Sequence, residues 1–102
     1  MELILKANEM RDGGVAITSI YNGEERVSRY GNAKNRIYPL YKELMFFARM
    51  ARGQSLVIKT NSFTFVDELK LLESCEKRLG VMLKEVLATN AVTIKSVEQV
   101  KE

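Results

Sequence analysis

The chain has 102 residues, of which 46% are hydrophobic and 28% charged, with a formal net charge of +3. This profile is typical of one folded domain with its own core and is unlike that of a disordered segment. With no histidine and a single cysteine, the composition excludes Ser-His-Asp triads, an intramolecular disulfide and a histidine-activated thiol. Its apolar runs are too short to span a bilayer and no leader precedes them, so we expect one cytoplasmic domain over residues 1–102, without membrane contact.

Three strands are predicted before the first helix. The run ELILKA is rich in branched and long apolar residues and ends at the polar, glycine-containing segment NEMRDGG. The runs VAITSIY and EERVSRY flank Asn22-Gly23, a pair favoured in type I′ turns because both turn residues take positive φ. We therefore expect one strand followed by a β-hairpin.

A helix is predicted from Ile37 to Arg52, where apolar residues recur at steps of three and four and so form one buried face. Asn35 is expected to cap the start of this helix. Pro39 is compatible with its first turn, where a missing N–H costs little. Gly53 is expected to end the helix.

The run SLVIKT predicts a further strand, and AVTIKSV a last one. Between them, apolar residues at helical spacing over 66–86 predict one kinked helix or two consecutive helices, with Gly80 as the weak point. Cys75 lies at helical spacing from Leu72 and Leu79, and we interpret it as a small core residue. The resulting order, β-β-β-α-β-α-β, predicts an α/β fold with a mixed five-stranded sheet and helices packed on it, since a strand-helix-strand passage makes a right-handed crossover between parallel strands.

This order and four short stretches together resemble the ribonuclease H-like fold family. LILKANEMRDGGVAITSI resembles the family's first strand and glycine-rich turn, and IYNGEERVSRYG resembles its hairpin and third strand. KNRIYPLYKELM contains an Asn-Arg pair like the one that opens the family's first helix. VIKTNSFTFVDEL resembles its fourth strand, which commonly ends in Thr-Asp-Ser before an aromatic residue and a helix. The resemblance covers nearly the whole chain and implies a single ribonuclease H-like domain, with the strand Leu3–Leu5 beside Leu56–Ile58.

The family hydrolyses the RNA strand of hybrids with Mg²⁺ ions held by carboxylates in the first strand, in the first helix and at the end of the fourth strand. The resemblance places these positions on Lys6 or Ala7, on Tyr38 or Pro39, and on Asn61. None of these residues is acidic, whereas divalent ions of this kind require clustered carboxylates. We therefore expect that catalysis is lost, with no catalytic residue, no metal site and no cofactor.

Two details of this alignment stay open. The segment KELM also resembles the family's Glu-Leu-Met, which would make Glu43 the helix carboxylate, although we interpret Glu43 as an exposed partner of Lys42 or Arg36. Asn61 is expected to cap the helix that follows it. That cap would suit a ribonuclease H-like turn that has lost its charge, and it would equally suit an unrelated α/β domain.

Basic residues are concentrated in the first part of the chain. Residues 1–59 carry ten Lys and Arg against six Asp and Glu, a balance of +4, whereas residues 60–102 carry six against seven, a balance of −1. Five basic residues follow one another without an acidic residue between them: Arg26, Arg29, Lys34, Arg36 and Lys42. This run could follow a phosphate backbone, with Tyr30 and Tyr38 stacking on bases, or it could be an ordinary solvated surface.

These observations favour an interaction module, a non-catalytic ribonuclease H-like domain that binds a protein partner and inhibits or scaffolds it. Small phage or mobile-element proteins that block a host machine have a similar profile, which is an analogy and not evidence from the fold. The alternative is a nucleic-acid-binding domain without cleavage activity that uses the basic run 26–42. A metal-dependent nuclease is a more distant alternative.

Overall fold

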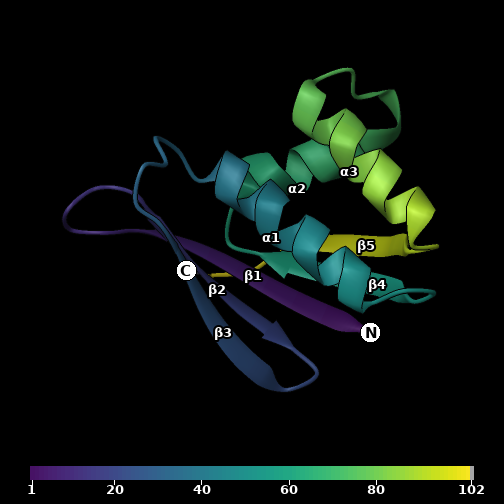
Figure 1. Ribbon diagram of the computed structural model, residues 1–102, viewed down its shortest axis with the longest axis horizontal. Helices are drawn as coiled ribbons and strands as arrows, with labels where there is room; N and C mark the ends of the chain where they lie inside the picture. Colours follow the sequence, from purple (N-terminus) through teal and green to yellow (C-terminus); the bar gives the residue numbers. More distant parts are fainter. Residues whose placement is uncertain (102) are drawn as a thin grey trace.

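The computed structural model describes residues 1–101, which form one five-stranded sheet with helices packed on it (Figure 1). The strands are β1 (Glu2–Glu9), β2 (Val15–Tyr21), β3 (Glu24–Tyr30), β4 (Ser55–Thr60) and β5 (Thr93–Gln99). The helices are α1 (Ile37–Met50), α2 (Phe63–Lys70) and α3 (Arg78–Thr89), with a short 3-10 turn, η1 (Leu72–Ser74), between α2 and α3. Within residues 1–101, no helix has the length and hydropathy that crossing a membrane requires.

The sheet is mixed, and its strand order is β3-β2-β1-β4-β5. β2 pairs antiparallel with both β1 and β3, whereas β1 and β4 are parallel, with Leu3 beside Ile58, and β4 and β5 are also parallel. This register confirms the expected neighbourhood of the first and fourth strands. Asn22 and Gly23 both have positive φ, 54° and 77°, as the predicted type I′ hairpin turn requires.

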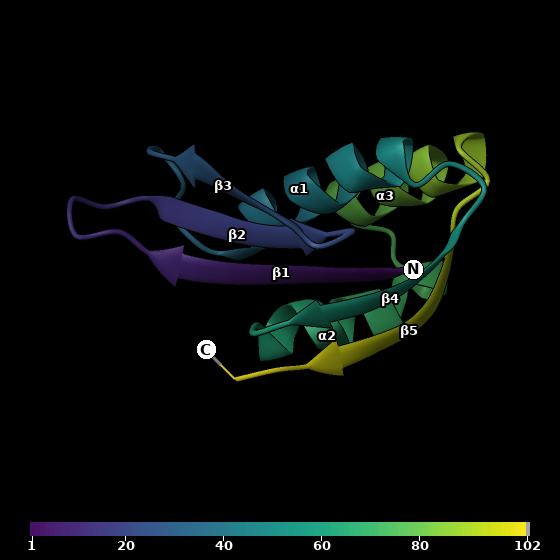
Figure 2. The same cartoon turned by 90° about the horizontal axis from the view of Figure 1, so that it is seen from below.

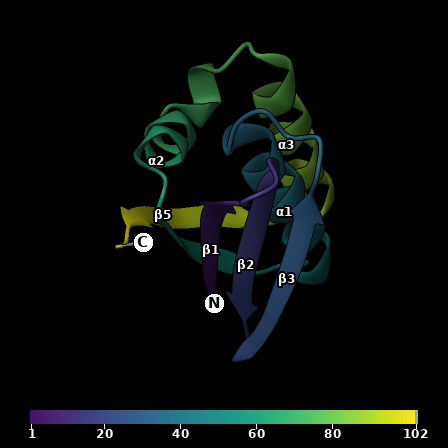
Figure 3. The same cartoon turned by 90° about the vertical axis from the view of Figure 1, so that its left-hand side faces the viewer.

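The helices lie on one face of the sheet. In β1 the side chains of Leu3, Leu5 and Ala7 are buried beneath them, while the alternate residues Ile4 and Lys6 lie half-buried on the opposite face. Figure 2 shows α1 and α3 on one side of β1 and β2, and Figure 3 shows α2 and α3 above β5. In the part of the chain that the structure describes, the second face of the sheet carries no helix.

Helix α1 begins where the sequence predicts. Arg36 occupies the N-cap position, but the capping contact comes from Asn35, whose side-chain oxygen accepts hydrogen bonds from the backbone N–H groups of Ile37 at 2.9 Å and Tyr38 at 3.4 Å. Pro39 lies in the first turn. The helix ends at Met50, slightly before the predicted end, because Ala51 leaves helical geometry at φ −91° and ψ 26°.

The predicted helical region over 66–86 is interrupted at η1 and at Cys75, and not at Gly80. Cys75 is extended, with φ −74° and ψ 127°, and lies half-buried against the core. Gly80 belongs to the first turn of α3, where a Cβ would collide with the Sγ atom of Cys75. The glycine therefore allows the connecting segment to approach α3 closely, and it does not break the helix.

Candidate functional site

The carboxyl ends of β1 and β4 bring together two residues that the sequence singled out, Ala7 and Asn61. The side-chain oxygen of Asn61 accepts a hydrogen bond from the backbone N–H of Ala7 at 2.8 Å, and its amide nitrogen donates to the carbonyl of Ala7 at 2.9 Å. Both residues are buried, at 0% and 5% exposure. The side-chain amide thus continues the parallel pairing of β1 with β4 beyond the last residue of β4.

The expectation that Asn61 caps the next helix is wrong. Ser62 is the N-cap of α2, and its hydroxyl oxygen accepts from the backbone N–H of Phe65 at 3.2 Å. Asn61 instead uses one amide N–H and its side-chain oxygen, which match the carbonyl and the N–H of a single facing residue, Ala7. An ionised aspartate could only accept, so it would place a negative oxygen against the carbonyl of Ala7.

The remaining positions of the implied metal site supply no carboxylate. Tyr38 is 47% exposed in the first turn of α1, and Nζ of Lys42 lies 5.9 Å from its ring centroid. Pro39 is buried, and Lys6 lies on the opposite face of the sheet. Within residues 1–101, no three His, Cys, Asp or Glu residues are grouped so that they could hold a metal ion. The residues present therefore do not fit the divalent ions that the resemblance implies.

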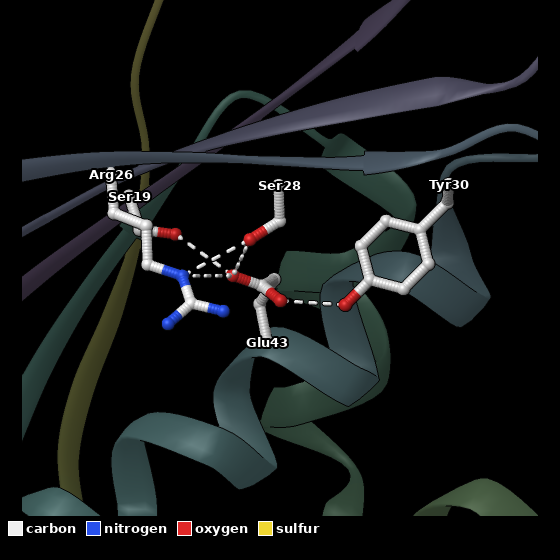
Figure 4. Close-up of polar contacts among 5 residues, drawn as sticks. All are labelled: Ser19, Arg26, Ser28, Tyr30 and Glu43. Atoms are coloured by element: carbon white, nitrogen blue, oxygen red, sulfur yellow. Dashed lines mark hydrogen bonds and ion pairs between the residues drawn. The ribbon is translucent and has the colours of Figure 1, made fainter.

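One carboxylate, that of Glu43, is buried on the sheet-facing side of α1 (Figure 4). The Tyr30 hydroxyl donates to its Oε2 atom at 2.6 Å, and the Ser28 and Ser19 hydroxyls donate to Oε1 at 3.1 and 3.5 Å. The Nε atom of Arg26 lies 3.9 Å from the same Oε1 atom. We call these five residues the Glu43 cluster. With 3% exposure, Glu43 is not the exposed partner of Lys42 or Arg36 that the sequence led us to expect.

The electrostatics of the Glu43 cluster fit a buried carboxylate. Three hydroxyl donors and a guanidinium surround its two oxygens. Burial, together with the hydrogen bond to Glu43 and the negative charge of Glu43, raises the pKa of Tyr30 well above its usual range. Tyr30 therefore stays a hydrogen-bond donor at neutral pH and holds the edge strand β3 to α1.

The Glu43 cluster lies apart from Asn61, because its hydroxyls come from β2 and β3 while β1 separates β2 from β4. Sequence reasoning missed this cluster. Its signal was present in the strand pattern, since Ser19 occupies a buried position in the alternation of β2, and the β3 residues Ser28 and Tyr30 pair with the buried Ile17 and Val15. Three polar side chains thus occupy the helix-facing side of a hairpin, where apolar residues would be expected.

The basic run does not form one surface. Arg26 belongs to the Glu43 cluster and its guanidinium carbon lies 4.1 Å from the ring centroid of Phe46, whereas Arg29 pairs with Ala16 and so lies on the opposite face of β3. Lys34 and Arg36 lie between β3 and α1, and Lys42 lies on α1. The Tyr30 hydroxyl is bound to Glu43, which leaves Tyr38 as the exposed aromatic residue of this run. Binding of nucleic acid by these residues stays a prediction.

Comparisons with known proteins identify the fold. No protein-family model matches the sequence, and a search of curated proteins found no significant match. Among solved structures, the chain is similar to ribonuclease H1 from the archaeon Halobacterium salinarum, with a TM-score of 0.60 and 13% identity over 99% of this chain and 83% of that one. It is also similar to the N-terminal ribonuclease H domain of a Mycobacterium tuberculosis protein, with a TM-score of 0.60 and 12% identity over 100% of this chain and 88% of that one. The chain therefore has the ribonuclease H-like fold, as its sequence predicts.

Proposed function

We propose that the chain is a non-catalytic ribonuclease H-like module that binds a protein partner and inhibits or scaffolds it. The observation that carries this proposal is the pairing of Ala7 with Asn61. The oxygen and the nitrogen of the Asn61 side chain are both hydrogen-bonded to the backbone of Ala7. Ala7 and Asn61 occupy two of the positions where the resemblance implies metal ligands. The buried carboxylate of Glu43 is bound by side chains of β2 and β3 instead.

The loss of catalysis is tested with an RNA–DNA hybrid in the presence of Mg²⁺ or Mn²⁺. We expect no cleavage above the level of a mock preparation, because a metal pair lacks its clustered carboxylates. The readout is the gel-resolved cleavage of labelled RNA by protein from successive chromatography steps. Cleavage that co-elutes with the folded chain through every step would overturn the non-catalytic part of the proposal.

Protein binding is tested by capture on the immobilised chain, with and without prior nuclease treatment of the extract. We expect a single protein whose recovery resists nuclease and which binds again when both components are purified. Recovery that disappears after nuclease treatment would mean that nucleic acid mediates the contact, and it would contradict the proposal.

Nucleic-acid binding without cleavage is the second candidate, and the exposed Tyr38 beside Lys42 favours it. Each phosphate contact releases about 0.7 to 0.9 counterion, so binding by all five basic residues would give a log-log salt slope of about −4. We expect at most weak binding at physiological salt, because Arg26 is engaged with Glu43 and Arg29 lies on the other face of β3. Tight binding that the variant Arg29→Ala/Lys34→Ala/Arg36→Ala loses would favour this second function.

A further inference from the structure

A groove runs along β5, where α2, η1 and α3 overhang this edge strand of the sheet. Figure 3 shows β5 passing below α2 and α3. The groove has a volume of about 740 Å³, and residues of α2, η1, α3 and β5 line it. We call it the β5 groove. A much smaller hollow of about 180 Å³ lies beside β3, the strand at the other edge of the sheet.

The β5 groove has an apolar floor. This floor is formed by residues that also belong to the core or pack against it: Leu69, Leu72, Leu87, Val92, Ile94 and Val97. The exposed Ala88 of α3 also lines the groove, and its small side chain leaves the entrance open. Apolar side chains of a bound molecule could therefore be removed from water without rearrangement of the core.

The rim of the β5 groove is positively charged. Lys70, Lys84 and Lys95 line it together with one acidic residue, Glu73. Lys84 donates to the backbone carbonyl oxygens of Cys75 at 2.8 Å and Glu73 at 3.4 Å, so its ammonium group is fixed at the rim. The side-chain ammonium groups of Lys70 and Lys95 have no hydrogen bond or ion pair with any residue of the described range 1–101. The rim therefore has two ammonium groups available for an anionic ligand.

Besides its apolar floor and its charged rim, the β5 groove has a third feature, the unpaired backbone edge of β5. Among the strands of residues 1–101, β5 pairs only with β4, so its outer edge offers unpaired N–H and C=O groups next to the groove. An extended peptide that pairs with such an edge presents alternate side chains to the same face of the sheet. On β5, that face is the one that the groove occupies, since Val97 belongs to both the core and the groove lining.

We propose that the β5 groove binds an extended acidic segment of a protein partner, which adds to the sheet as a sixth strand. Its alternate apolar side chains enter the groove, the acidic residues between them lie along β5 near Lys95, and an acidic residue at the end of the segment lies against Lys70. This inference rests on the proposed function, because it supplies the site and the chemistry of the protein partner. The edge strand β3 is a poorer docking site, since its exposed Glu24 and Glu25 would repel an acidic segment and the hollow beside it is small.

The experiment titrates ¹⁵N-labelled protein with a capped synthetic peptide of alternating Glu and Val residues. We expect shifts confined to amides of β5 and of the groove lining. A peptide with Lys in place of Glu should bind at least about tenfold more weakly, since exposed charge pairs across the rim change from attractive to repulsive. A Glu-Val peptide that is N-methylated at alternate residues should not bind, because it lacks the donors that pair with β5.

Protein variants locate the site. Ala88→Trp fills the groove from an exposed position and should abolish the shifts, whereas Val81→Trp, also on α3 but outside the groove, should leave them unchanged. Lys70→Glu/Lys95→Glu should weaken binding about tenfold at low salt and less at high salt. The matched charge variant is Lys77→Glu, an exposed lysine outside the groove lining, which should bind like the parent chain.

Several outcomes would overturn the inference: no shifts at millimolar peptide, shifts centred on β3, or binding that Ala88→Trp leaves intact. Concentration-dependent shifts of β5 without peptide would identify a second copy of the chain as the occupant. Shifts caused by decanoate but not by the peptide would identify an anionic amphiphile. Hybrid cleavage would refute the proposed function and leave the titration valid, whereas a chain that captures a nuclease-resistant partner but ignores the peptide would refute only this site.

Discussion

Two buried polar groups, the amide of Asn61 and the carboxylate of Glu43, are accommodated in opposite ways. Asn61 lies at the junction of the parallel strands β1 and β4, where its facing partners are the N–H and C=O of one residue, Ala7. Glu43 faces the antiparallel pair β2 and β3, where three hydroxyls and a guanidinium converge on it. A neutral side-chain amide can pair with the N–H and C=O of one backbone residue. A buried carboxylate, in contrast, needs several side-chain donors around it. The buried negative charge is therefore found where donors are available, and not at the end of β4.

The largest effect is expected from removal of the Glu43 carboxylate. Glu43→Ala leaves the Tyr30 hydroxyl without its acceptor, removes the ion-pair partner of Arg26 and creates a cavity under α1. A buried donor left unsatisfied typically costs about 1 to 3 kcal/mol, and the cavity adds to this cost, so we expect a loss of about 3 kcal/mol in the free energy of unfolding. Urea denaturation followed by circular dichroism measures this change.

Two control variants help to interpret the stability loss expected for Glu43→Ala. Glu43→Gln keeps the volume and one acceptor, so it should cost less than Glu43→Ala. Glu85→Ala removes an exposed carboxylate from α3 and should change the stability by no more than about 0.5 kcal/mol. Equal stabilities of Glu43→Ala and Glu85→Ala would show that the hydroxyls of the cluster contribute nothing to the fold.

The second-largest effect is expected from replacement of the Asn61 side-chain amide. Asn61→Asp removes the donor to the Ala7 carbonyl and places a carboxylate against it, so we expect a destabilisation of about 2 kcal/mol at pH 7. The introduced carboxyl should have a raised folded-state pKa, because burial and the carbonyl disfavour its charge. The deficit should therefore be small below the ordinary carboxyl pKa of about 4 and should grow as the pH rises above it.

The control for this second variant is Asn61→Ala, which loses both hydrogen bonds at every pH. Unfolding of both variants is measured between acidic and neutral pH, with the parent chain as reference. A deficit of Asn61→Asp that does not depend on pH would contradict the assignment of the Ala7 carbonyl as the group that requires a donor. Asn61→Asp should also fail to cleave an RNA–DNA hybrid, since a single carboxylate does not hold a metal pair.

A smaller effect is expected from Tyr30→Phe, which removes one hydroxyl donor but keeps the carboxylate and its other partners. We expect a loss of about 1 to 2 kcal/mol near neutral pH. Because the folded-state pKa of Tyr30 is raised, its contribution is present below the ordinary tyrosine pKa of about 10 and is lost as the pH rises through the folded-state value. The stability difference between the parent chain and the variant should therefore narrow at alkaline pH. The control is Tyr38→Phe, which removes a hydroxyl at an exposed site and should change the free energy of unfolding little.

The sequence predicts the architecture because local chemistry determines its elements. Asn22-Gly23 requires a turn with positive φ, and the helical periodicity from Ile37 requires one buried face of α1. The parallel placement of β4 beside β1 agrees with the expected crossover, in which α1 connects β3 to β4 across the sheet. Each of these predictions depends on residues close in the chain or on a rule of chain topology, and the structure confirms them.

The sequence predicts the polar contacts less well, because they join residues far apart in the chain. An Asx residue before a helix can cap it or extend a strand, and for Asn61 the outcome depends on Ala7, which belongs to another strand, and on Ser62, which takes the cap. Glu43 resembles an exposed helical residue until the hydroxyls of β2 and β3 are placed beneath it. In both cases the deciding partner is supplied by tertiary structure.

The smallest effect is expected where β1 and β4 are joined by an exposed ion pair. Nζ of Lys59 lies 3.0 Å from Oε2 of Glu2, with side chains 31% and 51% exposed, and this contact raises the pKa of Lys59. Solvent screens such a pair and its long side chains lose rotamer freedom, so Glu2→Gln should shift the urea midpoint less than Glu43→Ala, Asn61→Asp or Tyr30→Phe. The same two strands thus carry a buried amide contact and an exposed ionic one. If Glu2→Gln shifted the midpoint as much as Asn61→Ala at low and at high salt, burial would not be what distinguishes these two contacts.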